Sequence, residues 1–564
     1  MTIAEWPVGL TLIAGGLLAA ATRGRVRDAI SLAAPLLTLA QLVVLGHGDF
    51  ARLQVLGYTL ALMHVDRLSL LFGYVFAIAA LLNAIYGLHV RDGVQRAAAP
   101  LYAGSAVAAV FAGDLLTLFA FWELTAVASV FLIWARRTER SFAAGMRYLS
   151  VQLVSGLLLL AGALMYQAGT GSLVFGYLGL AAPGGALILA ACGLKISFPL
   201  LHNWLQDAYP EATETGTVVL SAFTTKLGIY ALARAFPGTE MLVWVGATMT
   251  AFPIFYAVIE NDLRRVLAYS MTNQLGFMVT GIGIGTDLAL NGAVAHAFAD
   301  ILFKALLFMS MGAVLLRTGT VKGSELGGLY KSMPWTTGFC IVGAASISAF
   351  PLFSGFVTKS MIMAAAAGQG HWAVWLVLLF ASAGVFHHAG IKIPYFAFFA
   401  HDSGIRCKEA PANMLVAMAL TAALCIGIGV FPGALYALLP RVVDFVPYTS
   451  SHVLSQLQLL VFSALAFSVL IRTGIYPPEL RSVNLDSDWV YRRLGPTLLR
   501  GTSALIGLAC GTVRGAASAT GASLSAFVLR HHRADGMFAR TLTTGSMVFW
   551  VAVLLAAYLV VYYA

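Results

Sequence analysis

The sequence predicts an all-α, polytopic membrane protein of about sixteen transmembrane helices, with two inverted five-helix repeats, each containing a broken helix, and a C-terminal surface helix region. Of the 564 residues, 60% are hydrophobic and 10% are charged, whereas soluble domains carry roughly 25% charged residues. Long apolar runs recur along the whole chain, without the alternating pattern of an outer-membrane barrel. In addition, two apolar segments are each interrupted by a proline near a lysine. The lysine precedes the proline in the first segment and follows it in the second.

Each predicted span is an apolar run of about 20 residues, the length that crosses a bilayer as a helix. In the first half of the chain these runs lie near residues 5–22, 29–47, 67–89, 98–112, 115–135, 147–167, 184–201 and 212–234. In the second half they lie near 240–259, 266–285, 288–316, 336–366, 371–400, 411–431, 453–472 and 543–563. They divide the chain into N-terminal helices (1–97), a first repeat (98–234), a second repeat (240–400), C-terminal core helices (411–472), a surface region (473–542) and a final span (543–564).

The surface region is the exception to the run of apolar segments. It carries several charges, among them Asp486 and Arg492, and then a weakly apolar stretch rich in Gly, Ala and Ser over residues 501–527. We interpret this region as a cytoplasmic, lateral helix that lies on the membrane surface. The alternative is a poorly hydrophobic transmembrane helix.

The loop charges predict the orientation of the chain. Most loop arginines and lysines follow odd-numbered predicted helices, as Arg23, Arg25 and Arg27 do. We expect the chain to lie in a bacterial-type cytoplasmic (inner) membrane. Because basic loops stay in the cytoplasm, the N-terminus should lie outside and the odd-numbered loops in the cytoplasm. The same placement argues against a nucleic-acid partner despite the net charge of +10. The five cysteines show no CxxC spacing, so neither a metal site nor a disulfide framework is expected.

Seven charged residues lie inside predicted spans, and they are the main functional signal. They are Glu123, Lys195, Lys226, Asp300, Lys304, Lys359 and Lys392. A charge at the bilayer centre costs roughly 2.5–3.5 kcal/mol, so seven would cost on the order of 20 kcal/mol if unpaired. They must therefore pair or face water. A buried ammonium can release its proton, whereas a guanidinium cannot, so internal lysines predict proton transfer. The alternative is a set of static pairs that hold helices together.

Two of these lysines lie beside helix breakers. Lys195 precedes Pro199 by one helical turn, whereas Lys359 follows Pro351 and Gly355. Proline inside a span frees backbone carbonyls that then need water or side-chain partners. Two interrupted helices in opposite order predict an inverted repeat with an ion site near the membrane midplane.

Histidines add two further candidate sites. His296, Asp300 and Lys304 recur every four residues and form one stripe on a helix, so His296 could exchange protons with an Asp300–Lys304 pair. His202 and Asp207 lie near the cytoplasmic end of the seventh predicted span. They could form a proton-uptake site, and a simple helix-end cap is the equal alternative.

The same residues carry a resemblance to a known family. The matching stretches are 121–125 around Glu123, Lys195 with Pro199 and residues 201–207, 225–228 around Lys226, 262–270, 296–308 and 354–359. Over residues 60–435 the chain resembles the antiporter-like subunits shared by Mrp-type cation/proton antiporters and the proton-pumping arm of respiratory complex I. Residues 207–217 and 221–225 are most similar to the D-type branch of the Mrp subunits.

The resemblance implies a role for each matched residue. Glu123 would be the acid of the fifth helix, Lys195 the lysine of the broken seventh helix and Lys226 the relay of the eighth. His296 and Lys304 would connect the relay through the eleventh helix to Lys359 on the broken twelfth. Asp300 stands where the family often has a second histidine, which implies a different electrostatic relay. Lys392 lies outside the matched motifs, and its role stays open. The tail is similar to that of longer members, whose lateral helix braces neighbouring subunits.

We therefore expect a transporter subunit rather than an enzyme, conducting protons within a multisubunit sodium/proton antiporter. Its partners would be other subunits of a hetero-oligomeric membrane complex, the lipid bilayer, protons and sodium. No nucleotide loop, haem attachment site or quinone signature is present in the sequence, so no cofactor is expected. The alternatives are a membrane subunit of a complex I-like or hydrogenase-linked redox complex, a subunit of an inorganic-carbon uptake complex, and an inert scaffold.

Overall fold

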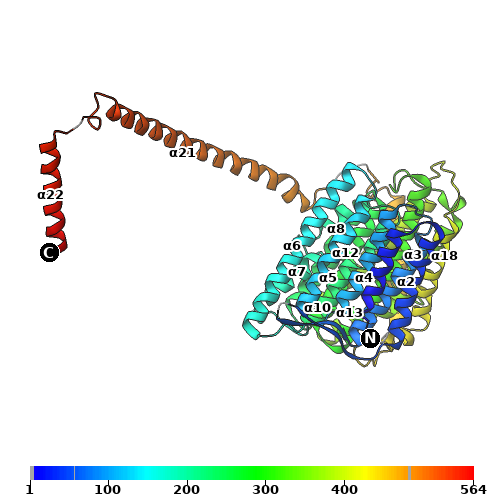
Figure 1. Ribbon diagram of the computed structural model, residues 1–564. Helices are drawn as coiled ribbons and strands as arrows, with labels where there is room; N and C mark the ends of the chain where they lie inside the picture. Colours follow the sequence, from blue (N-terminus) through cyan, green and yellow to red (C-terminus); the bar gives the residue numbers. More distant parts are fainter. Residues whose placement is uncertain (1–5, 56, 481–483, 541, 564) are drawn as a thin grey trace. The chain divides into compact units, whose positions relative to one another are not determined.

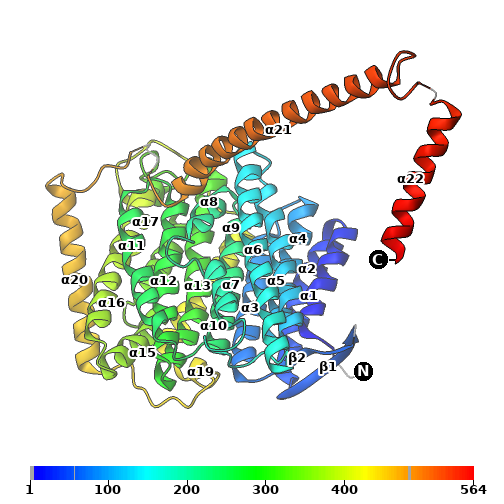
Figure 2. The ribbon, with the colours of Figure 1, turned by 90° about the vertical axis from the view of Figure 1, so that its left-hand side faces the viewer.

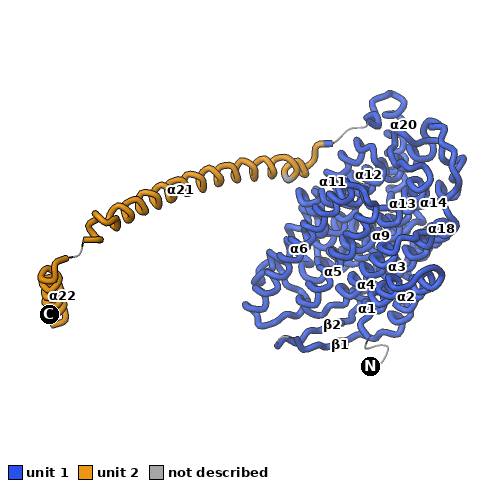
Figure 3. The backbone as a smooth tube through the Cα atoms, turned by 45° about the horizontal axis from the view of Figure 1, so that its top comes forward, with its two compact units in different colours: residues 1–484 blue, residues 485–564 orange. Residues whose placement is uncertain are grey.

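The structure is a computed structural model that describes residues 6–55, 57–480, 484–540 and 542–563. The chain divides into two compact units, residues 1–484 and 485–564 (Figure 3). Residues 473–480 and 484 belong to the first unit, and the predicted division into repeats and a surface region stays a prediction. Small parts of the predicted divisions, namely residues 1–5, 56, 481–483, 541 and 564, lie outside the described residues.

The first unit is a bundle of helices that run side by side, with a β-hairpin near the N-terminus (Figures 1 and 2). Its first half contains α1 (Val8–Ala21), α2 (Gly24–Val44), β1 (Gly48–Val55), β2 (Tyr58–Val65), α3 (Arg67–Tyr86), α4 (Gly93–Val110), α5 (Leu115–Trp134), α6 (Glu139–Thr170), α7 (Gly185–Ile196), α8 (Asn203–Ala208), η2 (Tyr209–Glu211), α9 (Gly216–Ala222) and α10 (Thr224–Ala235). Its second half contains α11 (Met241–Ile259), α12 (Leu263–Ile284), α13 (Asp287–Thr318), η3 (Leu329–Lys331), α14 (Pro334–Ile347), α15 (Ser354–Gly368), α16 (Trp372–Val385), η4 (Phe386–Ile391), α17 (Lys392–Pro394), η5 (Tyr395–Phe399), α18 (Ala412–Val430), α19 (Gly433–Tyr436) and α20 (Ser450–Arg472).

Every predicted span within the first unit contains a helix or a broken helix. Among the described residues, eleven helical stretches are long and apolar enough to cross a membrane. The prediction of a mostly helical membrane protein is confirmed, and the count of about sixteen spans stays a prediction.

Several helices of the bundle begin at an acidic N-cap, which explains where the apolar runs become helical. The side chains of Asp66, Asp114 and Asp262 accept hydrogen bonds from N–H groups in the first turns of α3, α5 and α12. Those N–H groups have no partner within the helix, so a capping carboxylate stabilises the helix start. The caps also place these charged groups at the ends of the spans.

The antiparallel hairpin of β1 and β2 is the one feature of the described bundle that the helical prediction does not contain. Its register pairs Gly48 with Val65 and Val55 with Tyr58. The hairpin is fixed to the turn between α4 and α5, because Gly113 N–H donates to the Ala61 carbonyl (2.9 Å) and Ala61 N–H donates to Asp114 (2.7 Å).

An ionisable cluster joins the two strands to α3. His64 Nδ1 lies 2.6 Å from Asp49 Oδ1, and its Nε2 lies 3.6 Å from Asp66 Oδ2. The Asp66 and Asp49 carboxylates raise the pKa of His64, although burial opposes them. Reciprocally, hydrogen bonding to His64 lowers the pKa of Asp49. The hairpin is therefore held partly by the contacts of His64 with two carboxylates.

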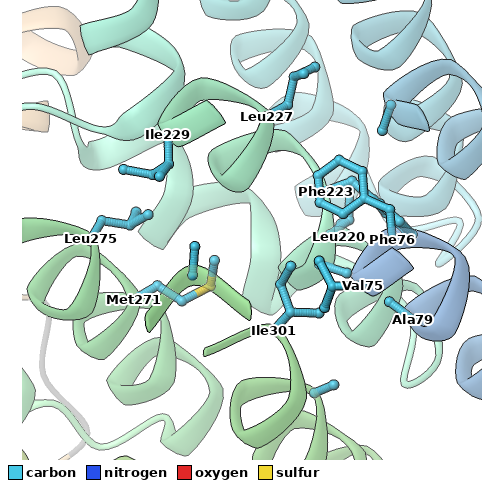
Figure 4. Close-up of a cluster of buried hydrophobic side chains, with 14 of the residues drawn as sticks. Val75, Phe76, Ala79, Leu220, Phe223, Leu227, Ile229, Met271, Leu275 and Ile301 are labelled. Carbon is cyan, nitrogen blue, oxygen red and sulfur yellow. The ribbon is translucent and has the colours of Figure 1, made fainter. Parts of the chain in front are cut away.

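The apolar core of the bundle lies where α3, α9, α10, α12 and α13 meet (Figure 4). The close-up shows side chains from these helices in one cluster, among them Phe76, Leu227, Met271 and Ile301. The central helix is α13, and 89% of its apolar 18-residue stretch is buried inside the bundle. Lys226 directly precedes Leu227, and Asp300 directly precedes Ile301. These two charged residues therefore lie in a densely packed region.

The second unit consists of η6 (Val490–Leu494), α21 (Gly495–His532) and α22 (Thr544–Tyr563). Helix α21 covers the predicted Gly/Ala/Ser-rich stretch and is 38 residues long. It is not among the eleven stretches that are apolar enough to span a membrane, whereas α22 is. The location of α21 on the membrane surface stays a prediction.

Candidate functional site

All five lysines predicted to lie within spans are buried. Lys195, Lys226, Lys304 and Lys392 have no exposed surface, and Lys359 is 3% exposed. His296 and Asp300 are also fully buried, whereas Glu123 is half-buried. Because unpaired buried charges are costly, the acceptors around each ammonium show how the fold accommodates it.

The two breaks predicted from Pro199 and Pro351 have the same backbone form. At 197–200 and again at 349–352, the first and last residues have positive φ angles (70° and 69°; 56° and 73°). Both stretches contain the same tripeptide, Phe-Pro-Leu. Left-handed conformations cost L-residues roughly 1–2 kcal/mol each and concentrate at functional sites. At the second break the Ile347 carbonyl at the end of α14 accepts from Lys359. At the first break the carbonyls of Gly193 and Leu194 at the end of α7 accept from N–H groups that follow the helix.

Lys195 ends α7 and faces α5. Its Nζ donates to the Trp122 carbonyl oxygen and to Thr125 Oγ1, both at 3.2 Å, and lies 4.0 Å from the centroid of the Trp122 ring. The last turn of a helix also attracts a cation. Within the described part of the chain Lys195 makes no ion pair with a carboxylate, so the ammonium is solvated only by neutral groups.

Glu123, predicted to lie near Lys195, interacts with it electrostatically without a hydrogen bond. Its buried Oε1 has no hydrogen-bond partner among the described residues. This carboxylate lies against Gly156 on α6, where any Cβ would collide with Oε1. A side chain at position 156 would therefore force the Glu123 carboxylate to move.

Hydroxyl groups fill the region between α5 and α10. The Tyr148 hydroxyl lies 2.7 Å from Ser129 Oγ and 3.5 Å from Thr224 Oγ1. Thr224 Oγ1 in turn lies 2.6 Å from the Tyr102 hydroxyl. Hydroxyls both donate and accept hydrogen bonds, so protons can be exchanged within this buried cluster.

Lys226 forms the one fully buried ion pair of the predicted residues, and its partner differs from the prediction. Lys226 Nζ lies 2.7 Å from Asp300 Oδ2, and neither side chain is exposed. Lys226 also donates to the Ser221 carbonyl at 3.2 Å. The expected Asp300–Lys304 ion pair is not formed: Lys304 Nζ donates to the Leu267 carbonyl at 3.4 Å. Helical spacing placed Asp300 and Lys304 on one stripe, but contacts between helices decide the partner.

His296 connects three helices. Its Nε2 lies 3.0 Å from Gln274 Oε1 on α12, and its Nδ1 lies 3.0 Å from Thr358 Oγ1 on α15. The adjacent residue on α15 is Lys359, whose Nζ donates to the Ile347 carbonyl at the end of α14 (3.2 Å). The contact between α13 and α15 at this point is thus made by His296 and Thr358, and a proton link from His296 to Lys359 stays a prediction.

Lys392 lies apart from these residues, in a segment where π-helical turns η4 and η5 flank α17. It forms an ion pair with Glu479 (2.8 Å) and donates to the carbonyls of Ala257, Val258 and Glu260 at the end of α11. An ammonium has three hydrogens, and here four acceptors surround it. This arrangement explains why residues after α20 belong to the first unit.

His202 directly precedes α8 and Asp207 lies within it, at the cytoplasmic side of the break after α7 in the predicted orientation. Arg147 binds Asp207 with two nitrogens, Nε at 2.6 Å and Nη2 at 3.1 Å. The His202 ring packs on Phe252, with centroids 4.6 Å apart. His202 makes no side-chain cap of α8. The proton-uptake role of the two residues stays a prediction.

Sequence reasoning passed over the neutral members of this site. Gln274, Thr358, Tyr148 and Thr224 carry no charge, so their burial gives no strong signal in composition. Of these residues Thr358 was the easiest to predict, because it directly precedes Lys359 in a matched motif. Among the described residues no group of three His, Cys, Asp or Glu side chains could hold a metal ion.

The fold and the site define a multi-pass membrane protein with broken helices around buried ionisable groups. Residues 112–386 match the NADH:quinone oxidoreductase/Mrp antiporter transmembrane family, and the chain belongs to this family. The matched range contains every predicted site residue except Lys392.

Relatives within the family have different names. The chain is 31% identical over 353 residues to NADH-quinone oxidoreductase subunit N of Desulforudis audaxviator, covering 56% of this chain and 69% of the relative. It is 31% identical over 308 residues to the D subunit of the Na(+)/H(+) antiporter of Alkalihalophilus pseudofirmus (50% and 62% covered). It is 27% identical over 412 residues to hydrogenase-4 component B of Escherichia coli (64% and 61% covered). The chain thus spans about three fifths of the length of the last two.

Solved structures share the fold. A chain of the membrane-bound sulfane sulfur reductase, an archaeal respiratory membrane complex, matches with a TM-score of 0.72 at 21% identity and covers 99% of this chain and 100% of that chain. A chain of the Mrp complex from Dietzia matches with a TM-score of 0.69 at 22% identity, with 78% of this chain and 96% of that chain covered.

Proposed function

We propose that the chain conducts protons across the membrane along a buried ionisable row formed by Glu123, Lys195, Lys226, Asp300, Lys304, His296 and Lys359. The observation that carries the proposal is the placement of four buried lysines of this row, of which, among the residues that the structure describes, only Lys226 forms an ion pair. A static scaffold would pair each charge, because unpaired burial is expensive. Ammonium groups held by neutral acceptors can release and regain protons.

The contacts support an order of transfer. Glu123 and Lys195 form the first part, and transfer from there to Lys226 would use the buried hydroxyls of Tyr148 and Thr224. Asp300 pairs with Lys226 and lies one helical turn from Lys304 on α13, so its charge can favour a proton on either lysine. Groups coupled in this way titrate as a set. His296 and Thr358 then connect the centre to Lys359.

We further propose that the chain works as a subunit of a multisubunit sodium/proton antiporter in a bacterial cytoplasmic membrane, with the N-terminus outside. Support comes from the relative named as the D subunit of a Na(+)/H(+) antiporter and from the fold shared with a chain of an Mrp complex. In this role the neighbouring subunits are partners, and sodium is exchanged elsewhere in the complex or along the same path.

A second candidate function is that of a proton-pumping membrane subunit in a redox complex. The relatives named NADH-quinone oxidoreductase subunit N and hydrogenase-4 component B favour it. The neighbouring reading frames distinguish the two candidates. Small antiporter subunits beside this gene would support the antiporter, and iron–sulfur or flavin subunits would support the redox complex.

The direct test uses inside-out vesicles that contain the whole operon product. We expect sodium addition, and more weakly potassium, to change the internal pH. Glu123→Gln removes the acid of the row and should abolish the change, whereas the control Glu139→Gln alters an exposed glutamate at the start of α6 and should not. A complex with Glu123→Gln that assembles and transports at the wild-type rate would overturn the proposal.

A further inference from the structure

A small cavity adjoins Lys359 on the side of α15 that faces α16 and α20. Its volume is about 30 Å³, more than the roughly 10–15 Å³ that one water requires by this measure. Polar lining groups are provided by Lys359, Ser360, Ser382, His452 and Gln456. Lys359 and His452 are the only ionisable side chains among them. The cavity is therefore polar enough and large enough to hold water between the two.

His452 is held in a defined position at the start of α20. Its ring stacks on Phe356, with centroids 4.4 Å apart and planes 19° apart, and Tyr448 stacks on Phe356 at 5.1 Å. His452 Nδ1 lies 2.7 Å from the Pro447 carbonyl oxygen. A carbonyl oxygen only accepts, so Nδ1 carries hydrogen and Nε2 is the proton-accepting nitrogen of the neutral ring. Nε2 makes no hydrogen bond to any part of the chain that the structure describes.

The surroundings of the cavity indicate which side of the membrane it serves. Helix α20 begins directly after the loop over residues 431–449, an even-numbered loop that the charge pattern predicts to lie outside. The Tyr436 hydroxyl of this loop region donates to the Val357 carbonyl on α15 at 2.8 Å. The loop thus covers the end of α15 next to Lys359, and His452 stands at the boundary between loop and cavity.

We propose that His452 is the proton-release residue of the buried ionisable row, taking protons from Lys359 through water in this cavity and passing them to the outside. The inference rests on the proposed function and adds a residue of α20 to it. Lys359 Nζ gives up a proton to a cavity water, and that water gives a proton to His452 Nε2. The proton on Nε2 then leaves to external water, while Nδ1 keeps its hydrogen on the Pro447 carbonyl, so the ring returns to its starting tautomer.

Three substitutions at position 452 separate proton transfer from packing. His452→Phe keeps an aromatic ring on Phe356 but cannot take a proton, and His452→Gln keeps polarity but cannot titrate. His452→Glu loses the stacking ring and restores a titratable group. Loss of a proton-transfer group lowers rates by a factor of about 10²–10⁴. We therefore expect His452→Phe and His452→Gln to reduce transport on the order of 10-fold or more. His452→Glu should retain more transport than either.

The opposite ranking would overturn the inference. If the His452→Phe variant transports well and the His452→Glu variant does not, His452 only packs against Phe356. Wild-type transport in all three variants would overturn it too. His371, which precedes α16 in another predicted outer loop, supplies the matched control, and His371→Gln should not alter transport.

A second variant tests the cavity without touching the imidazole. Ser382→Leu fills the cavity from α16, and we expect a loss similar to that of His452→Gln. Wild-type transport in that variant would contradict a water-filled path. The row itself is tested separately: if Glu123→Gln abolishes transport and the His452 variants do not, only the release residue is wrong. If Glu123→Gln also transports normally, the proposed function is wrong.

Discussion

Replacing Asp300 with asparagine tests whether the buried ion pair of α10 and α13 moves protons or only holds helices. Asp300→Asn removes one charge and keeps the size of the side chain. The wild-type oxygen lies 2.7 Å from Lys226 Nζ, with both side chains fully buried. At an effective dielectric constant of about 20, this distance corresponds to an attraction of about 6 kcal/mol.

The expected net cost is smaller than the attraction. Breaking a buried pair by removing one partner costs roughly 3–5 kcal/mol. At about 1.4 kcal/mol for each factor of ten, this cost corresponds to a factor of about 10² to 4 × 10³. If the Lys226–Asp300 pair is an obligatory step of the relay, we expect transport to fall by a factor of that order. The complex should also be less stable to heat.

The assay is sodium-driven pH change in inside-out vesicles, with assembly measured by native electrophoresis and thermal stability of the purified complex. The control is Asp287→Asn on the same helix, since Asp287 is 73% exposed and its ion pair with Arg441 lies at the surface. Surface pairs contribute about 0–1 kcal/mol, so this variant should assemble and transport almost normally.

The double variant Lys226→Met/Asp300→Asn separates the two explanations. Replacing both members of a buried pair with uncharged groups is often neutral for stability. We therefore expect the double variant to recover the thermal stability that Asp300→Asn loses, without recovering transport. Wild-type transport in the double variant, or transport in Asp300→Asn equal to that of Asp287→Asn, would refute a relay through this pair.

Two further predictions concern groups outside the row. Glu479→Gln should lower thermal stability, because Lys392 loses its counter-charge, while assembled complex keeps at least a tenth or so of its transport; complete loss in assembled complex would place Lys392 in the proton path. His64→Gln should loosen the hairpin only at low pH. Because the folded-state pKa of His64 is raised, its stabilisation is full below its ordinary pKa of about 6.5 and is lost as the pH rises through the folded value. Loss of a surface pair worth about 0.2–1 kcal/mol should raise the rate of amide exchange of residues 58–65 by up to about fivefold near pH 5.5. At about pH 9 the variant should match the wild type, and an equal difference at both pH values would contradict this origin.

Much of the fold was predictable because a membrane makes its constraints visible in composition. Apolar runs of the right length gave the helices, and prolines beside Lys195 and Lys359 marked both breaks. The hairpin was not predictable, since residues 58–65 are mostly apolar and their strand depends on contacts with the turn between α4 and α5.

The candidate site was predictable residue by residue but not pair by pair. Buried charges are rare enough in spans to be noticed singly, whereas their partners lie on other helices. Spacing along α13 suggested Lys304 as the partner of Asp300, but the ion pair is formed with Lys226 from α10. Gly156 gave no signal in the sequence, because its need for glycine arises only from the Glu123 carboxylate packed against it.

The central claim is that buried lysines release protons during transport, and Lys195 tests it most directly. Lys195→Arg keeps the positive charge but holds its proton permanently. Sodium-driven pH change should be measured in vesicles with equal amounts of assembled complex, against Lys322→Arg in a loop where the lysine is 47% exposed. We predict that Lys195→Arg abolishes transport while Lys322→Arg preserves it. Transport by Lys195→Arg at the wild-type rate would show that no proton leaves this group.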